Sequence, residues 1–344
     1  MKLLLTGGGT LGSVTPLLAL REEFVVEETY WIGTRGGVEE ELIQRSGIRF
    51  FSIRTGKFRR YFDWRTLRAP FDVIVGFFQA LFLLYRLRPT MVFAAGGYVA
   101  VPVILAAWFL CIPSYTLQLD YRPGLTNRFV APFVRKIFVV FPESARYFSP
   151  RKFLVTGGVV RKNIRMARPR SKSATERLTL LVLGGGTGAL SLNELLWSSM
   201  RELTALCDVV HITGIGKSKH IALPHYESYT LVTDVLPSLL CNADCVITRA
   251  GMGTLLELAL LKKAAIVVPL PKTHQEDNAD LLAQHNAAVV VRENDLTPEK
   301  LVALVGNLLH NVSRREQLGE NLYHYIPTDG AEKIVQHILS HNNG

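Results

Sequence analysis

Short apolar runs alternate with longer helical segments along the first half of the chain. The run Lys2 to Thr6 opens the series, and further strands are predicted at 29–32, 48–53, 91–95, 114–118 and 136–140. Helices are predicted between them, at 14–24, 38–46, 71–87, 101–110 and 125–134. Since strands that alternate with helices build parallel sheets, this half is predicted to be an α/β domain.

The second half repeats the pattern. A strand at 178–183 leads through a glycine turn at 184–189 into a helix at 191–201, and strands are predicted at 209–213, 230–233, 245–248 and 265–268. A stretch at 165–177, rich in Arg, Ser and Lys, reads as the linker. We therefore predict two Rossmann-like domains, 1–160 and 161–325, with parallel sheets that face each other across a cleft. The C-terminal helix, within 326–344, is expected to pack back on the first domain.

Charge is distributed unevenly between the halves. Residues 1–165 hold 23 Lys and Arg against 11 Asp and Glu, a net +12, and the remainder carries −2, giving +10 over 344 residues. Basic character confined to one half, beside apolar helices, indicates an anionic membrane surface. Because the sequence lacks a helix-turn-helix signature and an arginine-rich tract with stacking aromatics, no nucleic acid partner is predicted.

The membrane prediction centres on residues 57–68, which hold five cations, one anion and four aromatics and are predicted to form a loop. Its membrane-contacting residues are predicted to be Phe58, Arg59, Arg60, Trp64 and Arg65. The apolar helix that follows, 71–87, could span a bilayer, lie buried against the sheet, or rest with its outer face in the lipid interface together with the loop. We favour the last, which predicts a peripheral protein on the cytoplasmic face of the cell membrane.

The four cysteines are predicted to be buried, reduced thiols. They are Cys111, Cys207, Cys241 and Cys245, and the last two could share a helix face. With no second cysteine pair or histidine cluster beside them, no metal site is predicted. The strand at 2–6 runs directly into glycines without the long apolar region of a signal peptide, which also favours a cytosolic protein.

Residues 244–279 contain the strongest indication of a ligand site. A buried strand, Cys245 to Thr248, is followed by the small residues of a glycine turn and then by a helix predicted from Thr254. Such a turn leaves the first N–H groups of the helix free for an anion such as a diphosphate. Glu257 lies close enough to take a ribose hydroxyl, and a polar cluster at 274–278 follows the next strand. The alternative is a helix cap followed by a polar loop.

Strand ends in the first half point to a second crevice. The turns that carry Gly9, Gly97, Tyr98 and Asp120 each follow a predicted strand, and the carboxyl ends of parallel strands share one edge. The glycine run at 7–12 does not have the spacing of a Rossmann dinucleotide fingerprint, so no cofactor is predicted.

Several of these motifs together resemble one family. They are Gly7-Gly8-Gly9-Thr10 with Pro16, Gly96-Gly97-Tyr98-Val99, Pro123 to Asn127, Gly184 to Ala189 with Asn193, Arg249 to Glu257, and His274-Gln275 with Asn278-Ala279. Nearly the whole chain is similar, in order, to the MurG family of UDP-N-acetylglucosamine:N-acetylmuramyl-(pentapeptide) pyrophosphoryl-undecaprenol N-acetylglucosaminyltransferases. The chain departs from that family at Leu11 and Ser13, where the family has a glycine and a histidine.

The resemblance implies a GT-B fold and an inverting transfer of N-acetylglucosamine from a UDP-sugar to a polyprenyl-diphosphate-linked acceptor (lipid I), as a step of peptidoglycan synthesis. It assigns the UDP-sugar donor to Arg161, Gly186, Thr187, Val235, Gly251, Met252, Gly253, Thr254, Glu257, His274, Gln275 and Asn278. It assigns the acceptor side to Gly9, Thr10, Gly12, Gly97, Tyr98 and Asn127.

An inverting transfer needs a base and a means of holding the departing diphosphate. Asp120 is the candidate base, or else a turn former beside Pro123, and Ser13 can orient an acceptor oxygen. Because no Asp-x-Asp pair is present to carry a divalent cation, helix N-termini, Thr254 and Arg161 are expected to take the leaving charge. The alternatives are a transferase with another lipid acceptor, a UDP-sugar epimerase, and a non-catalytic UDP-sugar-binding subunit that recruits a partner to the membrane.

Overall fold

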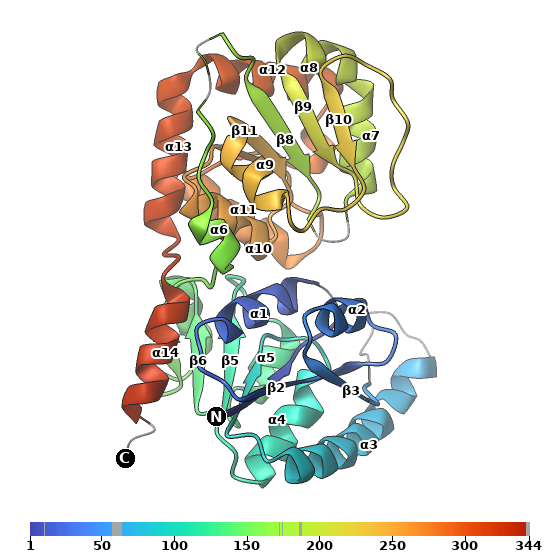
Figure 1. The fold of residues 1–344 in the computed structure, drawn as a ribbon, viewed down its shortest axis with the longest axis vertical. Helices are drawn as coiled ribbons and strands as arrows, with labels where there is room; N and C mark the ends of the chain where they lie inside the picture. Colours follow the sequence, from blue (N-terminus) through green and yellow to red (C-terminus); the bar gives the residue numbers. More distant parts are fainter. Residues whose placement is uncertain (10, 57–63, 172, 174, 186–187, 342–344) are drawn as a thin grey trace. The chain divides into compact units, whose positions relative to one another are not determined.

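The computed structural model describes residues 1–9, 11–56, 64–171, 173, 175–185 and 188–341, and the chain divides into two compact units (Figure 1). Unit 1 comprises Met1–Arg161 and Asp329–Gly344, and unit 2 comprises Lys162–Thr328. Each unit is an α/β domain built around one parallel sheet.

The sheet of unit 1 has seven strands in the order β3-β2-β1-β4-β5-β6-β7. The strands are β1 (Lys2–Thr6), β2 (Glu28–Thr34), β3 (Arg49–Ile53), β4 (Met91–Ala94), β5 (Ser114–Gln118), β6 (Lys136–Val139) and β7 (Phe153–Val155). β1 pairs in parallel with β2 on one side and β4 on the other, so the strand order reverses between β1 and β4. Such a reversal is where open α/β sheets bind ligands.

Helices cover both faces of this sheet. They are η1 (Leu11–Ser13), α1 (Thr15–Arg21), α2 (Val38–Arg45), α3 (Trp64–Leu87), α4 (Ala100–Phe109), α5 (Leu125–Val130), η2 (Pro142–Tyr147) and α14 (Gly330–His341). Leu3 and Leu5 pack on one face with α1 and α14, whereas Leu4 packs on the other with α3 and α4. A strand buried on both faces reads as a continuous apolar run, as LLL does here. The C-terminal helix α14 contributes Ala331, Ile334 and Ile338 to the core of unit 1.

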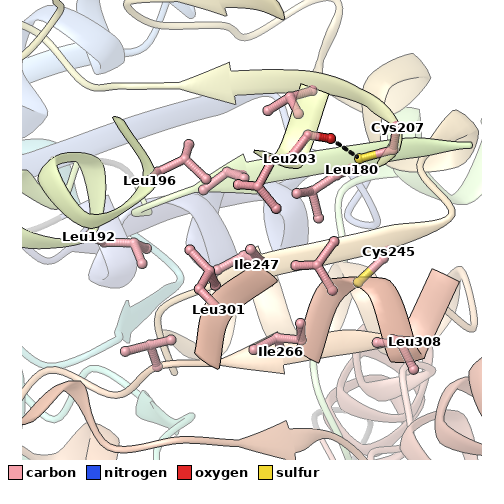
Figure 2. Close-up of a cluster of buried hydrophobic side chains, with 14 of the residues drawn as sticks. Leu180, Leu192, Leu196, Leu203, Cys207, Cys245, Ile247, Ile266, Leu301 and Leu308 are labelled. Carbon is pink, nitrogen blue, oxygen red and sulfur yellow. Dashed lines mark hydrogen bonds between the residues drawn. The ribbon is translucent and has the colours of Figure 1, made fainter. Parts of the chain in front are cut away.

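Unit 2 repeats the arrangement with six parallel strands in the order β10-β9-β8-β11-β12-β13. The strands are β8 (Thr179–Leu183), β9 (Asp208–Ile212), β10 (Tyr226–Tyr229), β11 (Cys245–Thr248), β12 (Ala265–Val267) and β13 (Val289–Val290). The helices are α6 (Lys162–Met166), α7 (Leu190–Ser198), α8 (Met200–Leu206), α9 (Leu236–Asn242), α10 (Met252–Leu260), α11 (His274–Gln284), η3 (Glu293–Asp295), α12 (Pro298–His310) and α13 (Val312–Tyr325). In Figure 2, side chains of β8 and β11 lie between those of α7 and α12.

The sequence predictions for the sheets are largely confirmed, and the differences have physical reasons. The strand predicted at 230–233 is wrong. That prediction is based on the β-branched residues of this run, but β10 lies at Tyr226–Tyr229. The helix predicted at 191–201 is interrupted at Ser199, between α7 and α8. Helix α3 begins at Trp64, so the second part of the predicted basic loop is helical. β7 and β13 were not predicted, because three and two residues give too short a pattern.

Two predictions about the cysteines are wrong. Cys111 is exposed, although the other three are buried as expected. Cys241 lies in the last turn of helix α9 and Cys245 begins strand β11, so they do not share a helix face.

Candidate functional site

Each unit has a strand-order reversal flanked by glycine turns, and these two places hold most of the predicted site residues. In unit 1 the turns after β1 and β4 carry Gly7 to Gly9 and Gly96 to Gly97. In unit 2 the turns after β8 and β11 carry Gly184, Gly185 and Gly188, and Ala250 and Gly251. The candidate site is therefore described separately for each unit.

Side chains from three different elements hold the turn after β1. The indole Nε1 of Trp31 on β2 donates to the Gly7 carbonyl at 3.2 Å, and the Ser13 hydroxyl donates to the Gly8 carbonyl at 3.4 Å. The Gly9 N–H donates to a carboxylate oxygen of Glu39 on α2 at 3.3 Å. Three successive backbone groups are thus paired, which keeps the turn in one conformation.

The turn after β4 lies directly against the turn after β1. A Cβ placed on Gly97, where φ is +78°, would lie 2.5 Å from the Gly8 carbonyl oxygen. A Cβ placed on Gly9 would lie 3.2 Å from Cε1 of the Tyr98 ring. The structure therefore brings Gly9, Gly97 and Tyr98 together, as the sequence predicts.

A polar network joins the end of β5 to helix α5 at the same edge. The Gln118 amide donates to the Asp120 carbonyl at 2.6 Å and accepts from the Asn127 amide at 2.7 Å. Asn127 also donates to the Leu117 carbonyl at 3.0 Å, and its side-chain oxygen lies 3.6 Å from a Cβ placed on Gly96. Asn127 is buried and Asp120 is half-buried, so Asn127 braces the edge at which the Asp120 backbone is held.

The remaining acceptor-side residues have different surroundings. Ser13 is buried, with its hydroxyl directed at the turn, and Gly12 is exposed in η1. Thr10, Phe58, Arg59 and Arg60 lie outside the described residues, and Trp64 and Arg65 are placed in α3 by their backbone only.

In unit 2, helix α10 begins at Met252, two residues earlier than predicted, with Gly251 at its N-cap. Gly251 has an extended backbone (φ −81°, ψ 127°), and no side chain caps the helix among the described residues. A Cβ placed on Gly251 or on Gly253 would meet no described atom within 4 Å. The packing of unit 2 does not require glycine at either position. With no side-chain cap, the N–H groups of Gly253 and Thr254 can face an anionic ligand.

The other donor-side residues surround this helix. Glu257 is buried in the second turn of α10, 6% exposed. Asn278 is fully buried and donates to the Ala250 carbonyl at 3.1 Å, so it supports the turn from α11. His274 and Gln275 begin α11, where His274 is exposed and Gln275 accepts from the Leu270 N–H at 3.0 Å.

Val235 and Arg161 both precede α10 in the sequence. Val235 is exposed at the N-cap of α9, beyond the carboxyl end of β10. Arg161, which the resemblance groups with the donor residues, is the last residue of the first segment of unit 1. Gly186 and Thr187 lie outside the described residues.

Two buried polar groups that were not among the predicted site residues hold the turns of unit 2. Arg249 is 4% exposed, and its guanidinium donates to the Val268 carbonyl at 3.2 Å, the Ser191 hydroxyl at 2.9 Å and the Glu293 carboxylate at 2.5 Å. Burial acts to raise the pKa of the Glu293 carboxyl, but the hydrogen bonds from Arg249 and Ser191 outweigh it and the pKa is lowered. Arg249 thus ties the end of β11 to β12, α7 and η3.

The second missed group is His211 on β9. Its Nε2 pairs with the Asn193 side-chain oxygen at 3.0 Å, and the Asn193 amide donates to the Thr213 carbonyl at 2.9 Å. That carbonyl lies 2.4 Å from a Cβ placed on Gly188. Burial lowers the pKa of His211 to about 4, so the ring is neutral at pH 7 and can share hydrogen bonds without a charge.

Neither a metal centre nor a transmembrane helix is found in the part of the chain that the structure describes. No group of three His, Cys, Asp or Glu side chains is arranged to hold a metal ion there. The described helices, α3 included, are too short or too polar to cross a bilayer.

Comparison with known proteins decides the family. Residues 3–139 match the Glycosyltransferase family 28 N-terminal domain, and residues 179–337 match the Glycosyltransferase family 28 C-terminal domain. The chain is 36% identical over 332 residues to the UDP-N-acetylglucosamine--N-acetylmuramyl-(pentapeptide) pyrophosphoryl-undecaprenol N-acetylglucosamine transferase of Geobacillus kaustophilus (strain HTA426), with 92% of each chain covered. The chain belongs to the MurG family. It is therefore a glycosyltransferase, as the motifs predict.

Solved structures agree on the fold. The crystal structure of Acinetobacter baumannii MurG matches with a TM-score of 0.77 and 25% identity, over 98% of this chain and 99% of that one. A putative UDP-N-acetylglucosamine 2-epimerase from Listeria monocytogenes matches with a TM-score of 0.71 but only 13% identity, over 99% of this chain and 96% of that one. The GT-B fold predicted from the sequence is confirmed, and it is shared with proteins of another chemistry.

Proposed function

We propose that this protein transfers N-acetylglucosamine from UDP-N-acetylglucosamine to a polyprenyl-diphosphate-linked N-acetylmuramyl acceptor, lipid I, giving lipid II with inversion at the sugar. Relatives that match this chain over 92% of their own length are named as this transferase. The observation that carries the proposal is the open start of α10, where an extended glycine leaves helix N–H groups uncapped beside a buried glutamate.

On the donor side, the N–H groups at the start of α10 bind the UDP diphosphate, because the helix dipole and unpaired donors favour negative charge. Glu257 accepts from a ribose hydroxyl. Asn278 and Arg249 act through the turn, which their hydrogen bonds hold in place. As the sugar leaves, charge builds on the diphosphate, and the same N–H groups stabilise it. Val235, His274 and Gln275 complete the donor side.

On the acceptor side, Asp120 takes the proton from the attacking hydroxyl, which forms its bond to C1 of N-acetylglucosamine while the bond from C1 to the diphosphate breaks. The paired turns around Gly9 and Gly97 and the ring of Tyr98 form the surface beside it. Replacing Asp120 by Asn removes the proton acceptor without a change of shape. We expect Asp120→Asn to bind UDP as wild type does and to lose about 10²–10⁴-fold in turnover. Turnover near the wild-type value at saturating substrates would remove Asp120 from this role.

Membrane attachment is proposed to occur through one apolar face of unit 1, here called the aromatic face. Its members are exposed apolar side chains of α3, α4 and α5, each more than half exposed: Phe71, Ile74, Phe78, Phe82, Tyr85, Trp108, Phe109, Leu125 and Phe129. The α3 members recur every three or four residues, which places them on one side of the helix, while Ala80 and Leu84 on the other side are buried in the core.

Ring contacts connect the three helices of the aromatic face. Phe77 meets Phe78 edge-on at 5.4 Å and Phe109 of α4 at 6.2 Å. Phe133 meets Trp108 at 5.4 Å and Phe129 of α5 at 6.2 Å. Soluble proteins seldom leave so large a connected apolar surface in water, and aromatic rings suit the level of lipid headgroups. With the excess of cations in the first half, this face suits the anionic cytoplasmic leaflet.

The transfer is tested with radiolabelled UDP-N-acetylglucosamine and lipid I, following label into the lipid phase. Label that stays in UDP-N-acetylglucosamine would refute the transfer. An epimerase would instead yield a C2 epimer of the UDP-sugar without any lipid acceptor, which chromatography of the nucleotide fraction detects.

Attachment is tested by co-sedimentation with anionic vesicles at low salt. The variant Phe78→Glu/Phe82→Glu should lose vesicle binding and keep UDP binding, whereas Val312→Glu, at an exposed apolar position of unit 2, should sediment as wild type does. Equal sedimentation of both variants would mean that another surface binds the membrane.

A further inference from the structure

One fully buried carboxylate in unit 1 has no part in the mechanism above. Glu39 lies in the first turn of α2, and its side chain is 0% exposed. One carboxylate oxygen accepts from the Thr34 N–H at 2.9 Å and from the Thr34 hydroxyl at 2.5 Å. The other accepts from the Gly9 N–H at 3.3 Å. The carboxylate thus links the end of β2 to the glycine turn after β1.

Three glycines leave the space that this carboxylate fills. A Cβ placed on Gly8 or on Gly37 would lie 2.4 Å from a Glu39 carboxylate oxygen, and one on Gly33 would lie 3.2 Å away. Neither Gly8 nor Gly37 has a positive φ, so close approach to the carboxylate is what excludes side chains there. A buried charge is costly unless it is hydrogen-bonded, and here the bonds all go to the two segments that it joins.

From this geometry we propose that Glu39 is a positioning residue for the acceptor: it holds the Gly7-to-Gly9 turn in the one conformation that fits against Gly97 and Tyr98. It does not touch substrate. Because a Glu39 carboxylate oxygen accepts from the Gly9 N–H, that N–H is directed into the protein. The acceptor then meets the opposite side of the turn. The inference rests on the proposed function for its acceptor, since the turn lies on the acceptor side of that proposal.

The variant that tests the contact is Glu39→Gln. Its amide oxygen can still accept both bonds from Thr34, but its NH₂ group then faces the Gly9 N–H, donor against donor. The matched control is Glu40→Gln, since Glu40 is the next residue of the same helix and accepts from the Gly36 N–H at 2.7 Å in an exposed position. Hydrogen exchange of the 7–9 segment is measured alongside acceptor and donor kinetics in both variants.

We expect Glu39→Gln to speed amide exchange in the Gly7-to-Gly9 turn and to leave the donor Kd unchanged. The acceptor KM should rise by about tenfold, which is the factor that the loss of a hydrogen bond to a charged group implies. Glu39→Asp, which keeps the charge but shortens the reach, should fall between wild type and Glu39→Gln. Glu40→Gln should match wild type in every measurement. The split between acceptor KM and donor Kd separates positioning from a general loss of stability.

Two results would overturn the inference. Unchanged exchange in Glu39→Gln would show that the carboxylate does not hold the turn, and faster exchange with an unchanged acceptor KM would show that the turn does not serve the acceptor. Wild-type protein that transfers nothing to lipid I would instead refute the proposed function and the acceptor part of this inference with it. The exchange comparison would still decide whether Glu39 holds the turn.

Discussion

The glycine at the N-cap of α10 permits a test in which stability and ligand binding change in opposite directions. Ser, Asp and Asn are common at N-caps because their side chains accept from the second or third helix N–H. Gly251 instead leaves those groups open, although its extended backbone suits an L-residue and a Cβ there would meet no described atom within 4 Å. Gly251→Asp should therefore cap the helix with its own carboxylate, at the place proposed for the donor diphosphate.

The expected magnitudes follow from this geometry. An Asp cap gains a few tenths of a kcal/mol over Gly, and a carboxylate at a helix N-terminus adds about 0.3–1 kcal/mol. For a unit of this size, such a gain raises Tm by about 1–4 °C. Against the diphosphate, two unit charges about 4 Å apart repel by about 4 kcal/mol at an effective dielectric constant of 20. Allowing for solvent screening, UDP affinity should fall by about a hundredfold.

Calorimetric UDP binding and thermal unfolding, measured on the same preparations, check both effects. Gly251→Ala is the control: it adds a Cβ but no acceptor, so it should bind UDP within a few-fold of wild type and be slightly less stable. If Gly251→Asp is stabilised but binds UDP as wild type does, the diphosphate does not lie at this helix. If it is not stabilised, the helix start is already capped and the reasoning from an open N-terminus fails.

Three further predictions concern buried groups of unit 2 and the exposed cysteine. Glu257→Ala should raise the donor Kd by about tenfold or more, the effect of a lost charged hydrogen bond, and unchanged calorimetric affinity would refute the ribose contact. Because the pKa of His211 is lowered from 6.5 to about 4 by burial, the unfolded chain binds its proton first as pH falls below 6.5. Between pH 7 and 5 wild type should lose about 2 kcal/mol more stability than His211→Gln, with exposed His220→Gln as control; equal slopes in denaturant melts would contradict this. A thiol reagent should label Cys111 alone in the native protein and all four cysteines after unfolding. The reason is that burial raises the pKa of the Cys207 thiol to about 11 and also raises the pKa values of Cys241 and Cys245. Fast labelling of a second thiol in the native protein would show that the core opens.

The parallel sheets could be predicted because their central strands are buried on both faces. Lys2–Thr6, Ser114–Gln118 and Cys245–Thr248 read as apolar or β-branched runs, and each strand lies where the pattern predicts it. Edge strands give a weaker signal, since β10 (YESY) is mostly polar and β13 has two residues. The sequence pattern therefore works best where burial, and not local propensity, decides the structure.

The glycine turns could be predicted from the sequence, whereas the polar groups that hold them could not. A glycine run after a strand marks a turn in the sequence itself, so Gly9, Gly97 and Gly251 could be predicted as site residues. Glu39 and Arg249 are not visible by that route, because each bonds to a group far away in the sequence: Glu39 accepts from the Gly9 N–H, and Arg249 donates to the Glu293 carboxylate. The glycines at 33 and 37, which both lie beside the Glu39 carboxylate, are a sequence feature that could have pointed to Glu39. They indicate a buried carboxylate only after the structure shows that Glu39 fills the space beside them.

The two units use the same arrangement at their strand-order reversals, and this explains which substitutions the site can tolerate. In each unit a buried polar side chain hydrogen-bonds to the backbone of a glycine turn. Glu39 accepts from the Gly9 N–H in unit 1, and Asn278 donates to the Ala250 carbonyl in unit 2. Because these two bonds go to the backbone of the turn, they constrain the path of the turn and not the side chains that it presents. Side chains that take no part in these bonds can therefore change without loss of the turn. Acceptor preference can then diverge within this family while the fold of the site is kept.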